Sequence, residues 1–320
     1  MIMEIAPGIH RIPTPLGERF CDLYLIVGSQ RAVLFDTGVA GSIQSSLLPE
    51  LTRLGIAPDF ISHVVVSHCD VDHYGGLADV ASQLPAAVTM AHAADAPLMD
   101  DFDMFMAGRG RPFAETYGVD EPPDGQVWLR GAAGDGHVAH QVEGGESLDL
   151  GGRRVRVVHV PGHSHGHLAV NVDDFWAISD AVLGEAVPLA DGSPAFPPTY
   201  RYVDAYRATI QQIRDAAPAM LATAHYGVFE GAAINDFLDA SMAFTNRMDA
   251  ATLAAVRQAG VGGANLADLL AKIDDGTWAW PQPAPPNALA FPVVGHLERL
   301  AAAGKIEIDA TRRPVQMRAL

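Results

Sequence analysis

The sequence has little cysteine, little positive charge and no long apolar run. Cys21 and Cys69 are its only cysteines, too few for a disulfide scaffold, so a reducing cytoplasm is the expected location. It contains no run of about 18 apolar residues, which argues against a membrane-spanning helix. Residues 1–7 lack the basic and apolar regions of a secretory signal. The net charge of −17 argues against a broad surface for nucleic acid.

The remaining composition is that of an ordinary globular protein, with 49% apolar and 18% charged residues among 320. Short β-type runs alternate with helical patterns up to about residue 240, which predicts an α/β fold. The predicted strands are 33–35, 64–66, 155–158, 175–178 and 220–223, and the predicted helices include 47–54, 77–84 and 206–213.

One short stretch, residues 67–76, is unusually rich in side chains that bind metals. His68, Asp70, Asp72 and His73 lie within six residues, directly after the β-branched run 64–66. Without a cation, these groups would repel one another or stay unsatisfied at the end of a buried strand. A polar surface turn is the alternative interpretation.

The same kind of residue follows other predicted strands. Asp36, His163, Asp180 and His225 each lie just past the end of one. In open α/β sheets, ligands bind at the carboxyl ends of the strands. The pattern therefore predicts one site shared by all these residues and the 68–73 cluster.

Together these motifs resemble the metallo-β-lactamase superfamily over roughly the first three-quarters of the chain. The matching segments are Phe35-Asp36-Thr37-Gly38, His68-x-Asp70-x-Asp72-His73-x-Gly75-Gly76, Pro161-Gly162-His163-Ser164-x-Gly166-His167, Ser179-Asp180 and Ala224-His225-Tyr226-Gly227. The resemblance implies a four-layer αββα sandwich with a two-metal site. The tail is similar to the winged-helix extension of one branch of hydrolases in this superfamily.

The resemblance also implies a role for each site residue. His68, Asp70 and His163 would hold the first metal ion, which defines the first position. Asp72, His73 and His225 would hold the second ion, at the second position, and Asp180 would bridge the two. Asp36 would orient a ligand through a hydrogen bond, and His167, close to His163 in the sequence, is expected from that position to form hydrogen bonds beside the site rather than to bind a metal. The catalytic roles would belong to Asp72 and Asp180.

One residue departs from the family pattern, since Asp70 stands where the family usually has His. Two imidazoles and a carboxylate form a donor set that suits non-haem iron. We therefore expect two divalent ions, zinc first, with iron or manganese as alternatives. The extra negative charge should make a bound water less acidic. An Asp70 side chain turned away would leave a single ion.

The predicted function is hydrolysis of a small ester, thioester or lactone by a metal-bound hydroxide. Tyr74, Tyr200, Tyr202 and Tyr226 are candidate donors to the oxyanion. One alternative is a non-haem iron oxidoreductase or dioxygenase of the same fold, suggested by Asp70. The other is a nuclease or nucleic-acid-binding protein, suggested by the tail. The expected partner is a small-molecule substrate rather than nucleic acid or a membrane, and a homodimer is left open.

The chain is divided into a catalytic domain, residues 1–244, and a helical winged-helix-like module, residues 245–320. Residues 96–145 interrupt the α/β rhythm and are interpreted as a small helix packed on the body, a cap over the site, or both. From residue 245 onward the sequence holds 8 Lys and Arg against 7 Asp and Glu, and 13 against 31 before it. A DNA-reading module would be more basic, so packing or dimerisation is the expected role.

Overall fold

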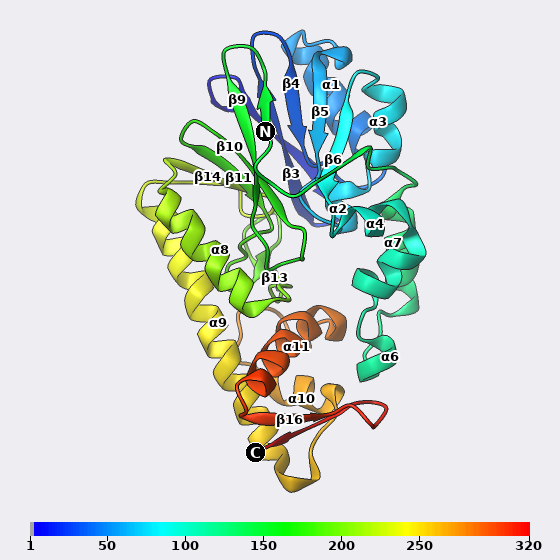
Figure 1. The fold of residues 1–320 in the computed structure, drawn as a ribbon, viewed down its shortest axis with the longest axis vertical. Helices are drawn as coiled ribbons and strands as arrows, with labels where there is room; N and C mark the ends of the chain where they lie inside the picture. The colour runs from blue at the N-terminus through cyan, green and yellow to red at the C-terminus, as the bar shows by residue number, and fades with distance from the viewer. Residues whose placement is uncertain (1–2) are drawn as a thin grey trace.

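Two β-sheets packed face to face form the centre of the fold (Figure 1). The computed structural model describes residues 3–320. The first sheet has seven strands in the order of the sequence: β1 (Met3–Ala6), β2 (Ile9–Leu16), β3 (Arg19–Val27), β4 (Ala32–Phe35), β5 (Ile61–Val65), β6 (Val88–His92) and β7 (His140–Val142). The second has six, in the order β15 (Val228–Glu230), β14 (Met220–Thr223), β11 (Phe175–Ser179), β10 (Leu168–Val172), β9 (Arg154–His159) and β8 (Ser147–Asp149).

The sheets pack together because apolar side chains alternate between the two faces of each strand. In β4, Val33 and Phe35 point into the layer between the sheets, whereas Leu34 points to the outer face. In β10, Val170 points into the same inner layer and Ala169 points outward. Each sheet therefore has a second apolar face that needs a cover.

Helices cover both outer faces. The outer face of the first sheet is covered by η1 (Ile43–Leu47), α1 (Leu48–Leu54) and α3 (Leu77–Gln83). A short helical turn, η2 (Pro58–Phe60), precedes β5. The second is covered by α8 (Val203–Ala216) and α9 (Ala232–Ala259). The predicted αββα sandwich is confirmed. None of the described helices is long and apolar enough to cross a membrane.

The segment between β6 and β7 is a chain of short helices rather than the single helix expected there. They are α4 (Ala96–Asp100), α5 (Phe102–Phe105), η3 (Met106–Gly110), α6 (Ala114–Tyr117) and α7 (Pro123–Ala133). Phe105 is buried in the core that covers the first sheet, and Phe102 and Met106 pack against it. The segment thus packs on the body, and it also forms one wall of the pocket described with the site.

The C-terminal region contains α10 (Leu266–Ile273) and α11 (Pro286–Ala302), followed by the antiparallel hairpin of β16 (Ile306–Asp309) and β17 (Gln316–Ala319). Strand β17 was not predicted, and it completes a wing-like hairpin. Helix α9 runs without a break through residues 244 and 245 and continues to η4 (Gly260–Gly262). The assigned boundary therefore falls inside a helix, and the division into two domains stays a prediction.

A buried polar cluster joins this region to the body. His296 of α11 is fully buried, with Nε2 2.9 Å from the Tyr200 hydroxyl and Nδ1 3.1 Å from Asp249 Oδ1. Arg299 donates to the same Asp249 oxygen at 2.8 Å. Burial lowers the pKa of His296, and the opposing effect of Asp249 does not restore it. The imidazole is therefore neutral in the folded protein near neutral pH.

We expect acidification to destabilise the protein through His296. Its pKa in the folded state lies below the ordinary 6.5, so the unfolded chain binds the proton first. The stabilising contribution is complete above pH 6.5 and is lost as the pH falls from there, by up to about 1.4 kcal/mol for each unit of pKa difference. Thermal unfolding of the wild type and of His296→Gln across this pH range measures the effect. Equal pH slopes for both proteins would contradict it.

Candidate metal centre

The site lies where strands of both sheets end. Asp36 follows β4, the 67–73 turn follows β5, and Asp180 and His225 follow β11 and β14. His163 lies in the loop between β9 and β10. The structure brings all the predicted ligands together at this edge.

Two of these segments pack closely against neighbouring helices because each contains a glycine at the point of contact. Asp72 and His73 lie on the single-turn helix α2 (Val71–Tyr74), and Asp70 directly precedes it. A Cβ on Gly75, just after this helix, would lie 2.0 Å from the carbonyl oxygen of Ala132. Gly162 has φ +139°, and a Cβ there would lie 2.4 Å from the Cα of Tyr206. Glycine at these two positions therefore lets the ligand-bearing loops pack closely against the helices behind them.

Asp36 organises the buried side of the site. One carboxylate oxygen accepts from the Ser67 backbone N–H at 2.7 Å. The other accepts from the Ser67 and Ser179 hydroxyls at 2.9 and 2.8 Å, and it lies 2.9 Å from Nδ1 of His73. Burial alone would raise the pKa of Asp36, but His73 and the donors around it hold this pKa below its usual value. The ionised carboxylate fixes Nδ1–H of His73 toward itself, which leaves Nε2 as an acceptor toward the centre.

The second position brings four donor atoms toward one point. Oδ2 of Asp72 lies 3.7 Å from His73 Nε2 and 3.5 Å from His225 Nε2. Oδ2 of Asp180 lies 3.6 and 3.3 Å from the same two nitrogens. Tetrahedral bonds of about 2.0–2.2 Å place neighbouring donors roughly 3.3–3.6 Å apart, and these four carboxylate–imidazole separations lie close to that spacing. Nδ1 of His225 donates to the carbonyl of Phe20 at 2.7 Å, which turns its Nε2 toward the centre.

Buried atoms without partners support this fit. Among the described residues, His68 Nε2, His73 Nε2 and Asp180 Oδ1 are buried and make no hydrogen bond. These three side chains, of which His68 belongs to the first position, form a group whose ligand atoms lie within 4.8 Å of one another, and the first-position residues His68, Asp70 and His163 form another. Buried polar atoms are normally satisfied, and a cation would satisfy these.

The carboxylates and imidazoles at the centre attract one another, and a metal ion there would compete with a proton for each imidazole. Burial alone would raise the pKa of Asp180, but His225 and His73 hold this pKa well below its usual range. Conversely, burial lowers the pKa of His225, and the carboxylate of Asp180 more than reverses that effect. The carboxylate of Asp180 and the two imidazoles beside it are thus held close together by mutual attraction. Cys21 lies nearby, but burial raises the pKa of its thiol to about 12, and its Sγ contacts the carbonyl of Asp72.

The first position differs, because its donors already have a cationic partner. His68, Asp70 and His163 come together, with Asp70 Oδ2 3.3 Å from His68 Nε2 and 3.0 Å from His163 Nε2. However, Arg109 forms a two-pronged ion pair with Asp70, in which Nη2 donates to Oδ2 at 2.7 Å. The same Nη2 lies 2.8 Å from His163 Nε2. Burial, together with the charge of Arg109, lowers the pKa of His163 to about 4.

His167, predicted to form hydrogen bonds beside the site, lies behind His68. Its ring stacks on that of His68 with centroids 4.5 Å apart, and its Nε2 donates to the carbonyl of Ile178 at 3.1 Å. The contact of His167 with His68 is therefore ring packing rather than a hydrogen bond, since its Nδ1 has no hydrogen-bond partner among the described residues.

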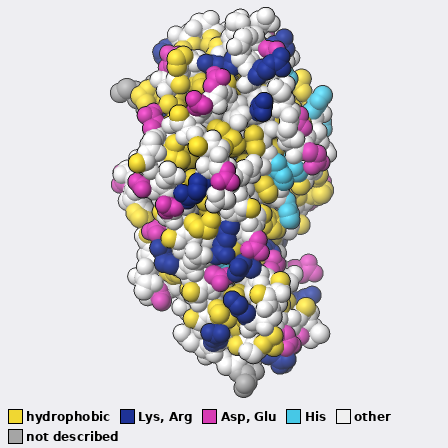
Figure 2. Space-filling view, turned by 60° about the vertical axis from the view of Figure 1, so that its left-hand side comes forward, with side chains coloured by type: hydrophobic (Ala, Val, Ile, Leu, Met, Phe, Trp, Pro, Cys, Tyr) yellow, Lys and Arg dark blue, Asp and Glu magenta, His cyan; other side chains and the backbone are white. Residues whose placement is uncertain are grey.

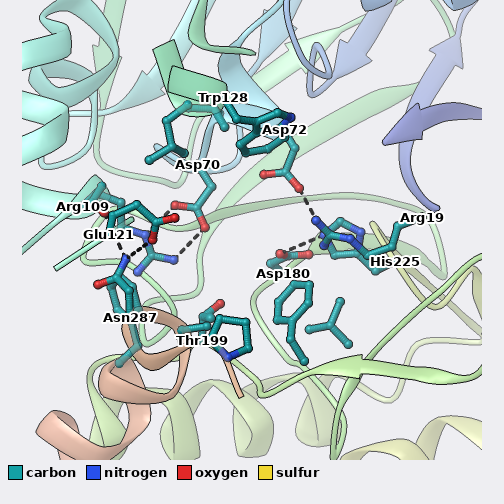
Figure 3. Close-up of a pocket in the computed structure, with 18 of the residues that line it drawn as sticks. Arg19, Asp70, Asp72, Arg109, Glu121, Trp128, Asp180, Thr199, His225 and Asn287 are labelled. Carbon is teal, nitrogen blue, oxygen red and sulfur yellow. Dashed lines mark hydrogen bonds and ion pairs between the residues drawn. The ribbon is translucent and has the colours of Figure 1, made fainter. Parts of the chain in front are cut away.

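The site opens into a pocket of about 270 Å³ (Figure 3). Figure 3 shows Asp70 and Arg109 on one side of the pocket and Asp72, Asp180 and His225 on the other. Its apolar walls include Phe105 and Trp128 from the segment between β6 and β7, Phe196 from β13 (Pro194–Phe196), which pairs with β12 (Val187–Pro188), and Phe291 from α11.

Sequence reasoning missed Arg109, Arg19 and the contribution of α11. Arg19 lies at the pocket with its guanidinium 4.5 Å from the ring centre of Phe196. The sequence offered one signal for Arg109, namely an arginine in the interrupting segment together with an unusual acid at position 70. The two residues are 39 positions apart, so the sequence does not show that they form a pair. None of the four candidate tyrosines is among the described residues that line this pocket, and Tyr200 is instead bonded to His296.

Comparison with known proteins agrees with this geometry. Residues 16–225 match the family model of the metallo-beta-lactamase superfamily. A probable metallo-hydrolase of Mycobacterium tuberculosis is 32% identical over 176 residues, which are 54% of this chain and 51% of that protein. A hydroxyacylglutathione hydrolase of Dechloromonas aromatica is 25% identical over 174 residues, 54% of this chain and 48% of that protein. The chain thus spans about half the length of these two relatives.

The fold is also shared along its whole length. The crystal structure of the metallo-beta-lactamase family protein TTHA1429 from Thermus thermophilus superposes with a TM-score of 0.76 at 19% identity, over 99% of this chain and all of that one. The chain belongs to the metallo-beta-lactamase superfamily. It is a metal-binding metallo-hydrolase of that superfamily.

Proposed function

We propose that the protein hydrolyses a small ester, thioester or lactone at its metal centre. The observation that carries the proposal is the second position, where Asp72 and Asp180 each place a carboxylate oxygen within 3.7 Å of the Nε2 atoms of His73 and His225, at an apolar-walled pocket. A divalent ion bound there lowers the pKa of water and polarises an acyl oxygen. Asp72 and Asp180 lie at the pocket with ionisable oxygens. They would orient the attacking water, and Asp72 would accept its proton.

The pocket walls support a small acyl substrate. Phe105, Trp128 and Phe291 offer an apolar surface, and Arg19 supplies a positive charge at the same pocket. Such a combination suits an apolar acyl group that also carries a polar or negative end. The Dechloromonas relative is named a hydroxyacylglutathione hydrolase, and an acyl group carried on the thiol of glutathione is a thioester, which favours that member of the class.

The metal content is also part of the proposal. Nitrogen and carboxylate donors suit zinc first, with iron and manganese as alternatives. The sequence predicts two ions, but the donors of the two positions differ. Those of the second position converge on one point, whereas Asp70 and His163 of the first also bond to Arg109.

The rival functions gain less support. The case for an iron oxidoreductase depended on Asp70 as a free hard donor, and Asp70 is ion-paired with Arg109. On the visible face, Lys and Arg are interspersed with Asp and Glu rather than gathered in a stripe (Figure 2). In the C-terminal region Arg299 and Arg318 form ion pairs with acidic residues. A small-molecule substrate, a cytoplasmic location and a possible homodimer stay proposals.

A substrate panel tests the function. The purified protein is stripped with a chelator, reloaded with zinc, manganese or iron, and assayed on aliphatic esters, acyl thioesters and lactones. We expect turnover of at least one class, loss of turnover after stripping, and recovery after reloading. Oxygen consumption with iron and no hydrolysis with any metal would favour the dioxygenase alternative. Hydrolysis that is unchanged by stripping would refute a metal-dependent mechanism.

A further inference from the structure

Arg109 occupies an unusual place for an arginine. It belongs to η3, within the short helices between β6 and β7, and its side chain is only 7% exposed. Besides its contacts to Asp70 and to His163 Nε2, its Nη1 donates to the carbonyl of His163 at 3.2 Å. Its guanidinium carbon lies 4.3 Å from the ring centre of Phe291. The charge is thus held by hydrogen bonds on one side and by an aromatic face on the other.

These contacts commit two of the three donors of the first position. His163 Nε2 lies 2.8 Å from Nη2 of Arg109 and 3.0 Å from Oδ2 of Asp70, and both oxygens of Asp70 accept from the guanidinium. Only His68 Nε2 makes no hydrogen bond among the described residues of this set. At the second position, by contrast, the four converging donors bond to no arginine or lysine side chain of the described chain.

The side chains of Asp70 and Arg109 are complementary in shape and charge. A carboxylate presents two oxygens that match the fork of a guanidinium, which a histidine at position 70 would not do. The aspartate at position 70, where the family usually has histidine, can therefore serve to bind an arginine as well as to bind a different metal. Burying a charged arginine is costly unless it is paired, and the two carboxylate oxygens of Asp70 provide that partner.

We propose that the guanidinium of Arg109 takes the place of the first metal ion, so that the protein binds one ion, at the second position. The inference deepens the proposed function and rests on a metal-dependent mechanism. The guanidinium donates three of its five N–H groups to Asp70 and to the carbonyl of His163, and a fourth lies against His163 Nε2. Because Arg109 lines the pocket, the fifth is available to an oxygen of the substrate. A fixed cation would thus replace an exchangeable one beside the reacting acyl group.

The number of bound ions tests the inference directly. The full-length protein is dialysed against zinc, washed with a weak chelator, and its zinc per chain is measured by mass spectrometry. We expect one ion in the wild type. Arg109→Ala frees Asp70 and His163, so two ions are expected in that variant. The double variant Arg109→Ala, Asp70→Ala loses the restored donor and should return to one.

Arg130→Ala is the matched control. Arg130 lies in the same segment, its guanidinium is 4.7 Å from the ring centre of Phe102, and its partner is Asp135 rather than a metal-binding donor. This variant should keep one ion. A cobalt-loaded sample provides a second readout, because a new ligand field in Arg109→Ala changes the visible absorption spectrum, whereas removal of a merely structural ion pair leaves it unchanged.

The possible ion counts distinguish failure of the inference from failure of the proposed function. Two tightly bound ions in the wild type would overturn the inference and assign Arg109 to holding Asp70 as a ligand. One ion in folded Arg109→Ala would also overturn it. Arg109→Met keeps the length of the side chain if the alanine variant fails to fold, and the wild-type count decides the matter without any variant. Hydrolysis with two ions would leave the proposed function intact, whereas one ion without hydrolysis would leave only the ion count supported.

Discussion

Replacing Asp180 by asparagine is expected to reduce zinc affinity and hydrolysis by more than about 100-fold, because loss of an outer orienting partner alone costs about 10–100-fold. Asp180 Oδ2 lies beside both imidazoles of the second position, and its other oxygen has no hydrogen-bond partner among the described residues. An amide keeps the shape of the side chain but removes its negative charge. Dialysis equilibrium with zinc and initial rates on the best substrate of the panel measure the two effects.

The control for this variant is Asp236→Asn. Asp236 is an exposed aspartate on α9, and the same change of charge there should leave zinc binding and rate unchanged. Zinc affinity in Asp180→Asn within a few-fold of the wild type would remove Asp180 from the ligand set. It would also indicate that the bound ion lies elsewhere than the second position.

Replacing Asp36 by alanine is expected to affect both stability and metal binding. The change leaves the Ser67 N–H and Nδ1–H of His73 without their buried acceptor. Removing one partner of a buried ionic network typically costs about 3–5 kcal/mol in the free energy of unfolding. With Nδ1–H of His73 no longer fixed, the affinity for zinc should fall by about 10–100-fold.

Denaturant unfolding and zinc dialysis on the same samples measure both effects of Asp36→Ala. Asp36→Asn separates them, because an asparagine can still accept from one donor but turns an N–H toward the other. We expect it to keep more of the stability than alanine while still weakening zinc binding. A fully stable Asp36→Ala protein with normal zinc affinity would show that His73 is oriented by Ser179 alone, whose hydroxyl lies 3.0 Å from the same nitrogen.

The sandwich and the ligand cluster could be predicted because both leave local signals in the sequence. The strands before Asp36 and His68 are apolar runs that end at a polar residue, and neighbouring parallel strands bring their ends to one edge of a sheet. Alternation along β4 likewise predicts which side chains face the second sheet. These features depend on a few consecutive residues, so a single sequence is sufficient to find them.

Arg109, Phe291 and the course of α9 could not be predicted in the same way. The ion pair of Arg109 depends on how five short helices fold back over the 67–73 turn, and nothing in the spacing of the chain encodes that path. Phe291 reaches the pocket only because α11 packs against α8 and α9. The domain boundary was assigned where the composition changes, but a helix continues for as long as its apolar face is covered, and α9 is covered on both sides of residue 244.

The position of α11 gives the C-terminal region a part in forming the pocket. Asn287, Ala288 and Phe291 lie at the pocket, so residues far from every predicted metal ligand in the sequence shape the space in which a substrate binds. Variation in the length or sequence of this region among related enzymes would therefore alter which acyl groups are accepted while the ion-binding residues stay the same. Shortening the chain before α11 would leave the reaction centre open to solvent on one side.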